Sequence, residues 1–261
     1  MTHALRDSST MLRRNLKHML RYPSMTLMLL LMPVVFLLLF VYVFGGTLGA
    51  GLGGTGGGRT AYLEYVTPGI ILMAVCGAVQ GTSISVAMDM TQGIIARFRT
   101  MAISRGSVLT GHVLGSIIQA MLCVVVILGI AFAIGFRTEA NFLQWLGVAG
   151  MLLLLAFALT WLTVALGLVT KSVETASNLP MPLILLPFLG SGFVPTDSMP
   201  TALRWFAEYQ PFTPVMETLR ALLHGTTTST TNVALGIGWC VAISLGGYFW
   251  ARKLFERNIV R

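Results

Sequence analysis

Six long apolar runs limit this chain to folds that lie mostly inside a membrane. The runs cover residues 25–44, 66–87, 108–134, 143–169, 179–194 and 233–249. A helix needs about 20 apolar residues to cross the hydrocarbon core of a bilayer. Only 10% of the residues are charged and 55% are hydrophobic, whereas soluble domains carry about 25% charged residues. The sequence therefore predicts an all-α membrane protein with six transmembrane helices.

The positions of Lys and Arg predict the orientation of these helices. Cytoplasmic flanks of transmembrane helices retain positive charge during insertion. With six spans both termini share one side, and that side receives thirteen of the seventeen basic residues. We therefore expect both termini in the cytoplasm and attribute the net charge of +8 to topology rather than to nucleic-acid binding. The excess of Arg over Lys favours a bacterial source, and hence the bacterial inner membrane.

A glycine-rich stretch, GLGGTGGGRT at residues 51–60, resembles a phosphate-binding loop. From Gly53 it reads G-x-x-x-x-G, and Arg59 stands where such loops have Lys. A dinucleotide-type G-x-G-x-x-G also begins at Gly49. Both motifs work only between a buried strand and a helix N-terminus, and this stretch follows the first apolar run on the external side. Nine of the fourteen residues at 45–58 are glycine, and we interpret this whole run as a flexible external loop, so the chain has no evident ATPase of its own.

The chain divides into three predicted parts. Residues 1–24 place leucines on one helical face and basic residues on the adjoining face, which is typical of an amphipathic helix in the membrane interface. This helix could serve as a lipid anchor, as a docking element, or as both. Residues 25–250 form the six-span domain, and residues 251–261 form a basic cytoplasmic tail.

Side chains for catalysis or metal binding do not cluster in the sequence. The four histidines are scattered, so we predict no metal site and no enzymatic activity for this chain. Cys76, Cys123 and Cys240 fall within apolar runs and are interpreted as packing residues. The carboxylates lie almost entirely outside the runs, with Asp89 at the inner end of the second. An ion-coupled carrier needs an ionisable group at depth, so this pattern argues against one.

Uncharged polar residues inside the runs are the candidates for a translocation path. They are Gln80 and Ser83 in the second run and Ser116 and Gln119 in the third. The alternative is helix packing with internal hydrogen bonds, because these residues accompany the G-x-x-x-G pairs Gly77/Gly81 and Gly111/Gly115. The sequence leaves both interpretations open.

The fifth run and the segment after it are rich in proline. We expect a short, kinked span that breaks before its outer end. The following segment is too polar to span, and we predict two short external or re-entrant helices at residues 199–209 and 213–223 before the sixth span. The residues that mark this external re-entrant segment are Pro195, Met199, Pro200, Pro211, Pro214 and Arg220.

Two stretches resemble the ABC-2 type transporter permeases. FVPTDSMPTALRWFAEYQPFTPVMETLRALLHG, residues 193–225, resembles their outer segment, and GIIARFRTMAISRGSVLTGHVLG, residues 93–115, resembles their loop between spans two and three. The daunorubicin-resistance-type permeases are the most similar subgroup. Members of the family often have an acidic residue where this chain has Ala96 and Pro where it has Ala102.

The resemblance implies a permease subunit of an ATP-driven exporter for amphipathic or lipophilic cargo, such as a drug, an antibiotic or a lipid. Two permease subunits, the second being the same or a homologous chain, would dock on separate cytoplasmic P-loop ATPases. Those ATPases would bind ATP and Mg²⁺, and this chain would bind no cofactor. A scaffold without transport activity is the alternative from another functional class.

The loop at residues 91–107 is the predicted contact with the ATPase. Among the predicted internal loops it is the one that is both long and basic, and it places Phe98 and Met101 among its arginines. Aromatic, Met and Arg residues are enriched at protein interfaces. A solvated loop that follows only the positive-inside rule would not need an exposed Phe and Met. The candidate coupling residues are Arg97, Phe98, Arg99, Met101, Ile103 and Arg105.

Overall fold

The fold is a helical bundle. The computed structural model describes residues 12–13, 17, 21, 23–51, 58–91 and 105–260. Every regular element in these ranges is a helix, which confirms the predicted all-α class. The predicted interface helix at residues 1–24 lies almost wholly outside the described residues.

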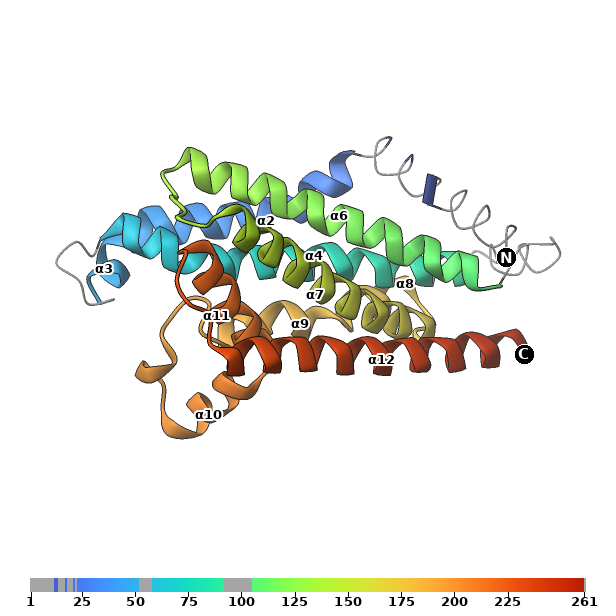
Figure 1. Ribbon diagram of the computed structural model, residues 1–261. Helices are drawn as coiled ribbons and strands as arrows, with labels where there is room; N and C mark the ends of the chain where they lie inside the picture. The colour runs from blue at the N-terminus through green and yellow to red at the C-terminus, as the bar shows by residue number, and fades with distance from the viewer. Residues whose placement is uncertain are drawn as a thin grey trace.

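The first part of the chain supplies the long central helices. They run back and forth along the bundle (Figure 1). In order they are α2 (Pro23–Leu39), which continues through a π-helical turn, η1 (Phe40–Phe44), into α3 (Gly45–Ala50), then α4 (Arg59–Thr91), α6 (Arg105–Ala133) and α7 (Phe142–Val169).

The second part of the chain contains mostly short helices. Only its last helix is long, and it returns along the whole bundle beside α7 (Figure 1). The elements are α8 (Val173–Asn178), α9 (Met181–Leu185), the 3-10 turns η2 (Leu186–Leu189) and η3 (Thr196–Ser198), α10 (Thr201–Tyr209), α11 (Phe212–Leu223) and α12 (Thr230–Val260).

Five helical stretches of the described chain are long and apolar enough to cross a membrane. They are Leu27–Ala50, Arg59–Thr91, Leu109–Ala133, Phe142–Val169 and Thr230–Glu256. The predicted fifth span at 179–194 is instead divided among α9, η2 and a turn, because Pro180, Pro182 and Pro187 restrict the backbone there. The predicted break is confirmed, and a membrane crossing by this segment stays a prediction.

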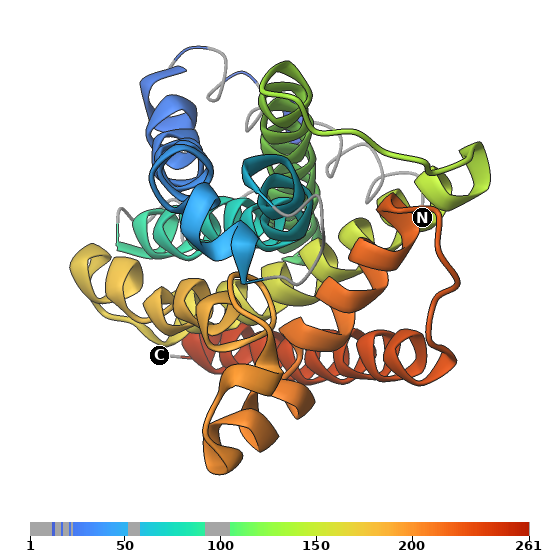
Figure 2. The ribbon, with the colours of Figure 1, turned by 90° about the vertical axis from the view of Figure 1, so that its left-hand side faces the viewer.

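The predicted external helices are present with nearly the expected bounds. The range 199–209 corresponds to α10 and the range 213–223 to α11. Seen from the end of the bundle, α10 projects away from the long helices (Figure 2). Whether these helices dip into a membrane leaflet stays a prediction.

The first part of the glycine run corrects one expectation. Residues 45–50 are helical in α3 rather than a loop, because the run continues directly from the apolar helix before it. Arg59, at the position of the P-loop lysine, lies with its guanidinium carbon 3.6 Å from the centroid of the Tyr42 ring. Residues 52–57 lie outside the described residues. No strand precedes the run within the described chain, so the context that a phosphate-binding loop needs is missing.

Helix α4 is the centre of the bundle. It contacts α2, α6, α7, α8, α9 and α11, and most of its residues are buried. Glycines allow its closest contacts: a Cβ on Gly167 of α7 would lie 2.7 Å from the Ser83 carbonyl oxygen. The predicted pair Gly77/Gly81 makes no such contact, because a Cβ at Gly77 would meet nothing within 4 Å. Close approach therefore depends on glycines that the G-x-x-x-G pattern does not identify.

Glycine also ends two helices at the same end of the bundle. The Phe136 N–H donates to the Ala131 carbonyl at 2.9 Å and the Thr226 N–H to the Ala221 carbonyl at 3.0 Å. Gly135 lies just before Phe136 and Gly225 just before Thr226, and their φ angles are 111° and 68°. This left-handed conformation favours glycine and closes the last turns of α6 and α11.

The two ends of the bundle are named after helices that lie there. We call the end where α3, α10 and α11 lie the α11 end, and the opposite one the α8 end (Figure 1).

The positive-inside rule predicts that the α8 end faces the cytoplasm. A cysteine placed at Ser229, an exposed residue at the α11 end, should react with an impermeant thiol reagent in intact cells, and one at Thr175 in α8 should not. The wild-type chain is the control, because its three cysteines are buried. Labelling of the Thr175→Cys variant, with the Ser229→Cys variant protected, would reverse the orientation.

Candidate functional site

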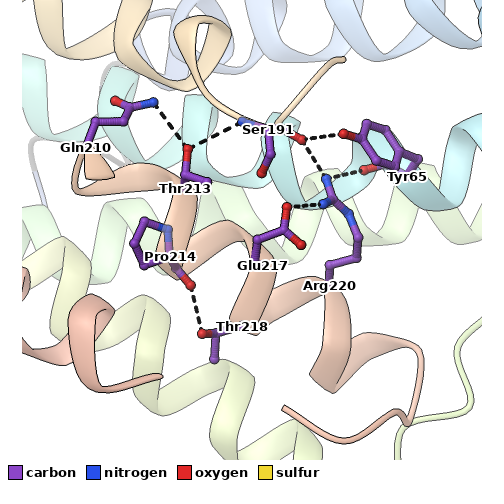
Figure 3. A network of polar contacts seen from close by, with 8 residues as sticks. All are labelled: Tyr65, Ser191, Gln210, Thr213, Pro214, Glu217, Thr218 and Arg220. Atoms are coloured by element: carbon purple, nitrogen blue, oxygen red, sulfur yellow. Dashed lines mark hydrogen bonds and ion pairs between the residues drawn. The ribbon is translucent and has the colours of Figure 1, made fainter. Parts of the chain in front are cut away.

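A network of polar contacts at the α11 end is centred on Arg220 of α11 (Figure 3). Its guanidinium donates to the Ser191 carbonyl at 2.7 Å, to the Tyr65 carbonyl at 3.3 Å and to Glu217 Oε1 at 2.6 Å. The guanidinium carbon also lies 4.0 Å from the centroid of the Tyr65 ring. One side chain therefore joins α11 to α4 and to the turn after η2. We call this group the Arg220 network.

The turn after η2 explains why these donors are needed. A broken helix in an apolar bundle leaves carbonyl groups without helical partners. Tyr65 Oη donates to the Ser191 carbonyl at 2.8 Å, and Tyr62 Oη donates to the Phe193 carbonyl at 3.1 Å. The backbone approaches α4 closely, since a Cβ on Gly69 would lie 2.7 Å from the Gly192 carbonyl oxygen.

The other side of the turn is held by Gln210 and Thr213. Gln210 Nε2 donates to the Leu186 carbonyl at 2.9 Å, which closes the end of η2. Thr213 Oγ1 accepts the Ser191 N–H at 3.4 Å. Both residues are buried. The broken segment is thus fastened by side chains of α4 and α11 on either side.

The prolines predicted to mark the outer segment lie at helix starts. Pro195, Pro200 and Pro211 directly precede η3, α10 and α11, and Pro214 lies in the first turn of α11. Proline suits these positions because the first helical N–H groups have no partner in the helix. Met199 lies between η3 and α10. Of the predicted residues of this segment, Arg220 is the one that connects it to the bundle.

One face of α4 is left partly uncovered by the described part of the chain and leads toward the α8 end. Its residues recur every three or four positions and are half-buried or exposed, while the residues between them are buried. The face borders α2 and α8, both of which contact α4. A Cβ on Gly81 would meet only Leu29 of α2, at 4.0 Å. We call this face the open strip; it comprises Gly77, Gln80, Gly81, Ile84, Ser85 and Met88.

The four residues predicted for a translocation path fall in different environments. Gln80 lies on the open strip, where its Nε2 donates to the Ser177 carbonyl of α8 at 2.6 Å. Ser83 is fully buried beside Gly167 of α7. Ser116 is buried, and its hydroxyl lies 3.2 Å from that of Thr160. Gln119 is half-buried on α6.

Sequence reasoning missed a pair at the α8 end. Asp89 of α4 and His112 of α6 lie with Oδ2 and Nε2 3.0 Å apart, and both are buried. When the carboxyl group is ionised it only accepts hydrogen bonds, and the imidazole N–H is then the donor. The signal was present in the sequence: one residue lies near the end of a helix, and the other near the start of the next. Considered one at a time, Asp89 is a carboxylate at the end of an apolar run and His112 is one of four widely separated histidines.

The predicted coupling residues lie mostly outside the described part of the chain. Arg97, Phe98, Arg99, Met101 and Ile103 fall in the range 92–104, and Arg105 is the first residue of α6. The helices that flank this range both meet the α8 end (Figure 1). Within the described residues, no three His, Cys, Asp or Glu side chains could together hold a metal ion. The three cysteines pack in the apolar core, as predicted.

Comparisons with known proteins agree with this architecture. The model of the ABC-2 type transporter family matches residues 7–224. The "Daunorubicin resistance ABC transporter permease protein DrrB1" of Streptomyces coeruleorubidus is 28% identical over 78% of this chain and 70% of its own length. The "Doxorubicin resistance ABC transporter permease protein DrrB" of Mycobacterium tuberculosis is 26% identical over 77% of this chain and 71% of its own. The "Probable doxorubicin resistance ABC transporter permease protein DrrC" of the same species is 24% identical, over 64% and 63%.

Proposed function

The chain belongs to the ABC-2 type transporter family, and we propose that it is the membrane-spanning permease subunit of an ATP-driven exporter of amphipathic or lipophilic cargo. The observation that carries this proposal is its similarity, over most of its length, to the drug-resistance permeases DrrB1 and DrrB. Anthracycline-like drugs are therefore the first cargo to test, and other antibiotics and lipids are further cargo of the same physical class.

Export by this chain needs an energy source from another protein. Arg59, at the position of the P-loop lysine, is engaged with Tyr42. ATP and Mg²⁺ would bind to separate cytoplasmic ATPase subunits, and a second permease chain, identical or homologous, would complete the membrane part. This chain would itself carry no enzymatic activity.

The open strip is the surface that we assign to the cargo. Glycines at positions 77 and 81 leave room beside the backbone of α4. Gln80 and Ser85 offer polar groups, and Met88 adds an adaptable apolar side chain. A few polar groups on an otherwise apolar surface are what a binding site for an amphipathic molecule requires. Ser83 and Ser116, which face α7, are better explained by helix packing.

The loop from 91 to 107 is the proposed contact with the ATPase. The Phe98→Ala/Arg97→Ala variant should insert normally but lose co-purification of the ATPase or hydrolyse ATP without export. Truncation of a buried aromatic anchor at an interface typically costs about 2 kcal/mol or more. The matched control is Phe142→Ala/Arg137→Ala, which removes the same residue types from exposed positions at the α11 end. Wild-type complex yield and transport in the Phe98/Arg97 variant would refute the assignment.

The proposed function is tested by expressing the chain in a drug-sensitive bacterium together with a candidate P-loop ATPase from a neighbouring gene of its source. We expect lower accumulation of daunorubicin or doxorubicin than with either chain alone. An ATPase variant that binds but does not hydrolyse ATP is the control, and accumulation should then return to the level of the host. If several lipophilic cargoes accumulate equally with and without the pair, although the chains co-purify, the chain is a scaffold and not a permease.

A further inference from the structure

The buried pair Asp89 and His112 has no part in the function proposed so far. The side chains of Asp89 and His112 are only 10% and 6% exposed. The other ion pairs of the described chain include at least one side chain that is a third or more exposed. Burial of a charged group is costly unless it is paired and hydrogen-bonded. A pair at this place therefore calls for an explanation beyond general stability.

The surroundings of the pair are apolar. A second hydrophobic cluster joins α4, α6, α7 and α12 at the α8 end, and Val86, Leu109 and Val113 bring it within one turn of the pair on either helix. Apolar contacts of this kind are not directional and would tolerate a small rotation or slide of one helix on the other. A charge-assisted hydrogen bond has a fixed length and direction. The pair thus favours one register between two helices whose surrounding contacts in this cluster are apolar.

The position of Asp89 in α4 is also unusual. It lies two residues before the last residue of the helix, Thr91. The C-terminal end of a helix carries partial negative charge, which disfavours a carboxylate there. A donor from the neighbouring helix offsets this cost, and His112 of α6 is in place to provide it.

The pair connects the two elements that the proposed function needs. Asp89 directly follows Met88, the last residue of the open strip. Residues 92–104, which hold most of the proposed ATPase contact, run from the end of α4 to the start of α6. A force applied to that segment acts on both helix ends, and Asp89 and His112 are the side chains that join those ends.

We infer that Asp89 and His112 are positioning residues that hold α4 and α6 in one rotational and axial register, so that movement of the segment at 92–104 reaches the open strip. This inference rests on the proposed function. The pair does not touch the cargo. It turns the inner halves of α4 and α6 into one body, and without it the two helix ends can yield separately, so that less of the movement reaches the open strip.

The test separates register from stability. The permease is co-purified with its ATPase, reconstituted in phospholipid vesicles, and the amount of doxorubicin moved per ATP hydrolysed is measured. Apolar replacement of a buried ion pair is often neutral or stabilising, so Asp89→Leu/His112→Met should assemble normally. We expect its transport ratio to fall by about five-fold or more, in the range of typical coupling energies. The exchange Asp89→His/His112→Asp rebuilds the pair and should recover most of the ratio.

Each outcome decides the inference. An assembled Asp89→Leu/His112→Met variant with the wild-type ratio overturns it, because the pair would then only fill space. If that variant does not assemble, Asp89→Asn/His112→Leu, which keeps side chains of similar size but removes both the carboxylate and the imidazole, decides the question: an unchanged ratio overturns the inference, and a reduced ratio supports it. The control removes the exposed pair Arg252–Glu256 at the same end, and it should leave the amount of doxorubicin moved per ATP hydrolysed unchanged. If the wild-type complex moves no cargo, the proposed function fails and the inference falls with it.

Discussion

Replacement of Gly77 by Phe is expected to reduce export strongly without lowering the yield of folded chain. Gly77 lies on the open strip, and a Cβ there would meet no atom within 4 Å in the described chain. The first carbon of the new side chain therefore meets no packed neighbour, and the ring extends into the space that we assign to the cargo. Overfilling an occupied site costs about 1–3 kcal/mol, which lowers affinity by about five-fold or more.

The matched control for this substitution is Gly129→Phe. Gly129 is exposed on α6, and a Cβ there would likewise meet no atom within 4 Å in the described chain. Both variants add the same ring to a long helix, but only the first adds it to the open strip. Drug accumulation and membrane yield are measured for the two in parallel. Equal export by both variants would show that the open strip is not part of the cargo path. An equal loss of export in both would show that an added ring on either helix is harmful.

Replacement of Arg220 by Ala should loosen the α11 end of the bundle. The guanidinium joins α11 to the Ser191 and Tyr65 carbonyls, and its side chain is 14% exposed. Loss of the guanidinium leaves the Glu217 carboxylate without its partner and the Ser191 carbonyl with the Tyr65 hydroxyl as its remaining donor, in a partly buried place, at a cost of about 2–3 kcal/mol. We expect a lower thermal unfolding midpoint in detergent and faster proteolysis after Tyr209. Arg220→Lys should recover little of the lost stability, because the compact ammonium of Lys cannot reach several acceptors at once as the planar guanidinium of Arg does.

Arg204 provides the control for Arg220. It also lies in the outer segment and pairs with two acidic residues, Asp197 and Glu208. Its side chain is 45% exposed, and exposed ion pairs contribute little to stability. Arg204→Ala should leave the unfolding midpoint unchanged. A fall as large as that of Arg220→Ala would mean that net charge in the segment, and not the Arg220 network, sets its stability.

The long elements and the outer helices follow from local patterns. Hydrophobic length predicts the five long apolar helices, and the prolines predict the broken segment at 179–194 and the two short helices α10 and α11. Both signals depend on residues close in sequence. The same reasoning misplaces residues 45–50, because a glycine run is compatible with a loop and also with a helix that continues from an apolar span.

The contacts between helices could not be predicted in the same way. Periodicity shows which residues share a face of α4, but not whether α7 or the membrane covers that face. The sequence therefore groups Ser83 and Gln80 as residues of one translocation path, although Ser83 is buried beside Gly167 and Gln80 lies on the open strip. Asp89 and His112 meet across 23 positions, and only the packing of α4 on α6 makes them a pair.

The central claim, that cargo moves along the open strip of α4, is tested most directly by photo-crosslinking. A photoreactive derivative of doxorubicin is added to the reconstituted complex of permease and ATPase, and the labelled residues are identified by peptide mapping. We predict labelling of α4 between Gly77 and Met88, reduced by excess unmodified drug and absent from the exposed face of α6 around Gly129. Competable labelling confined to α6, α10 or α12, with none on α4, would contradict it.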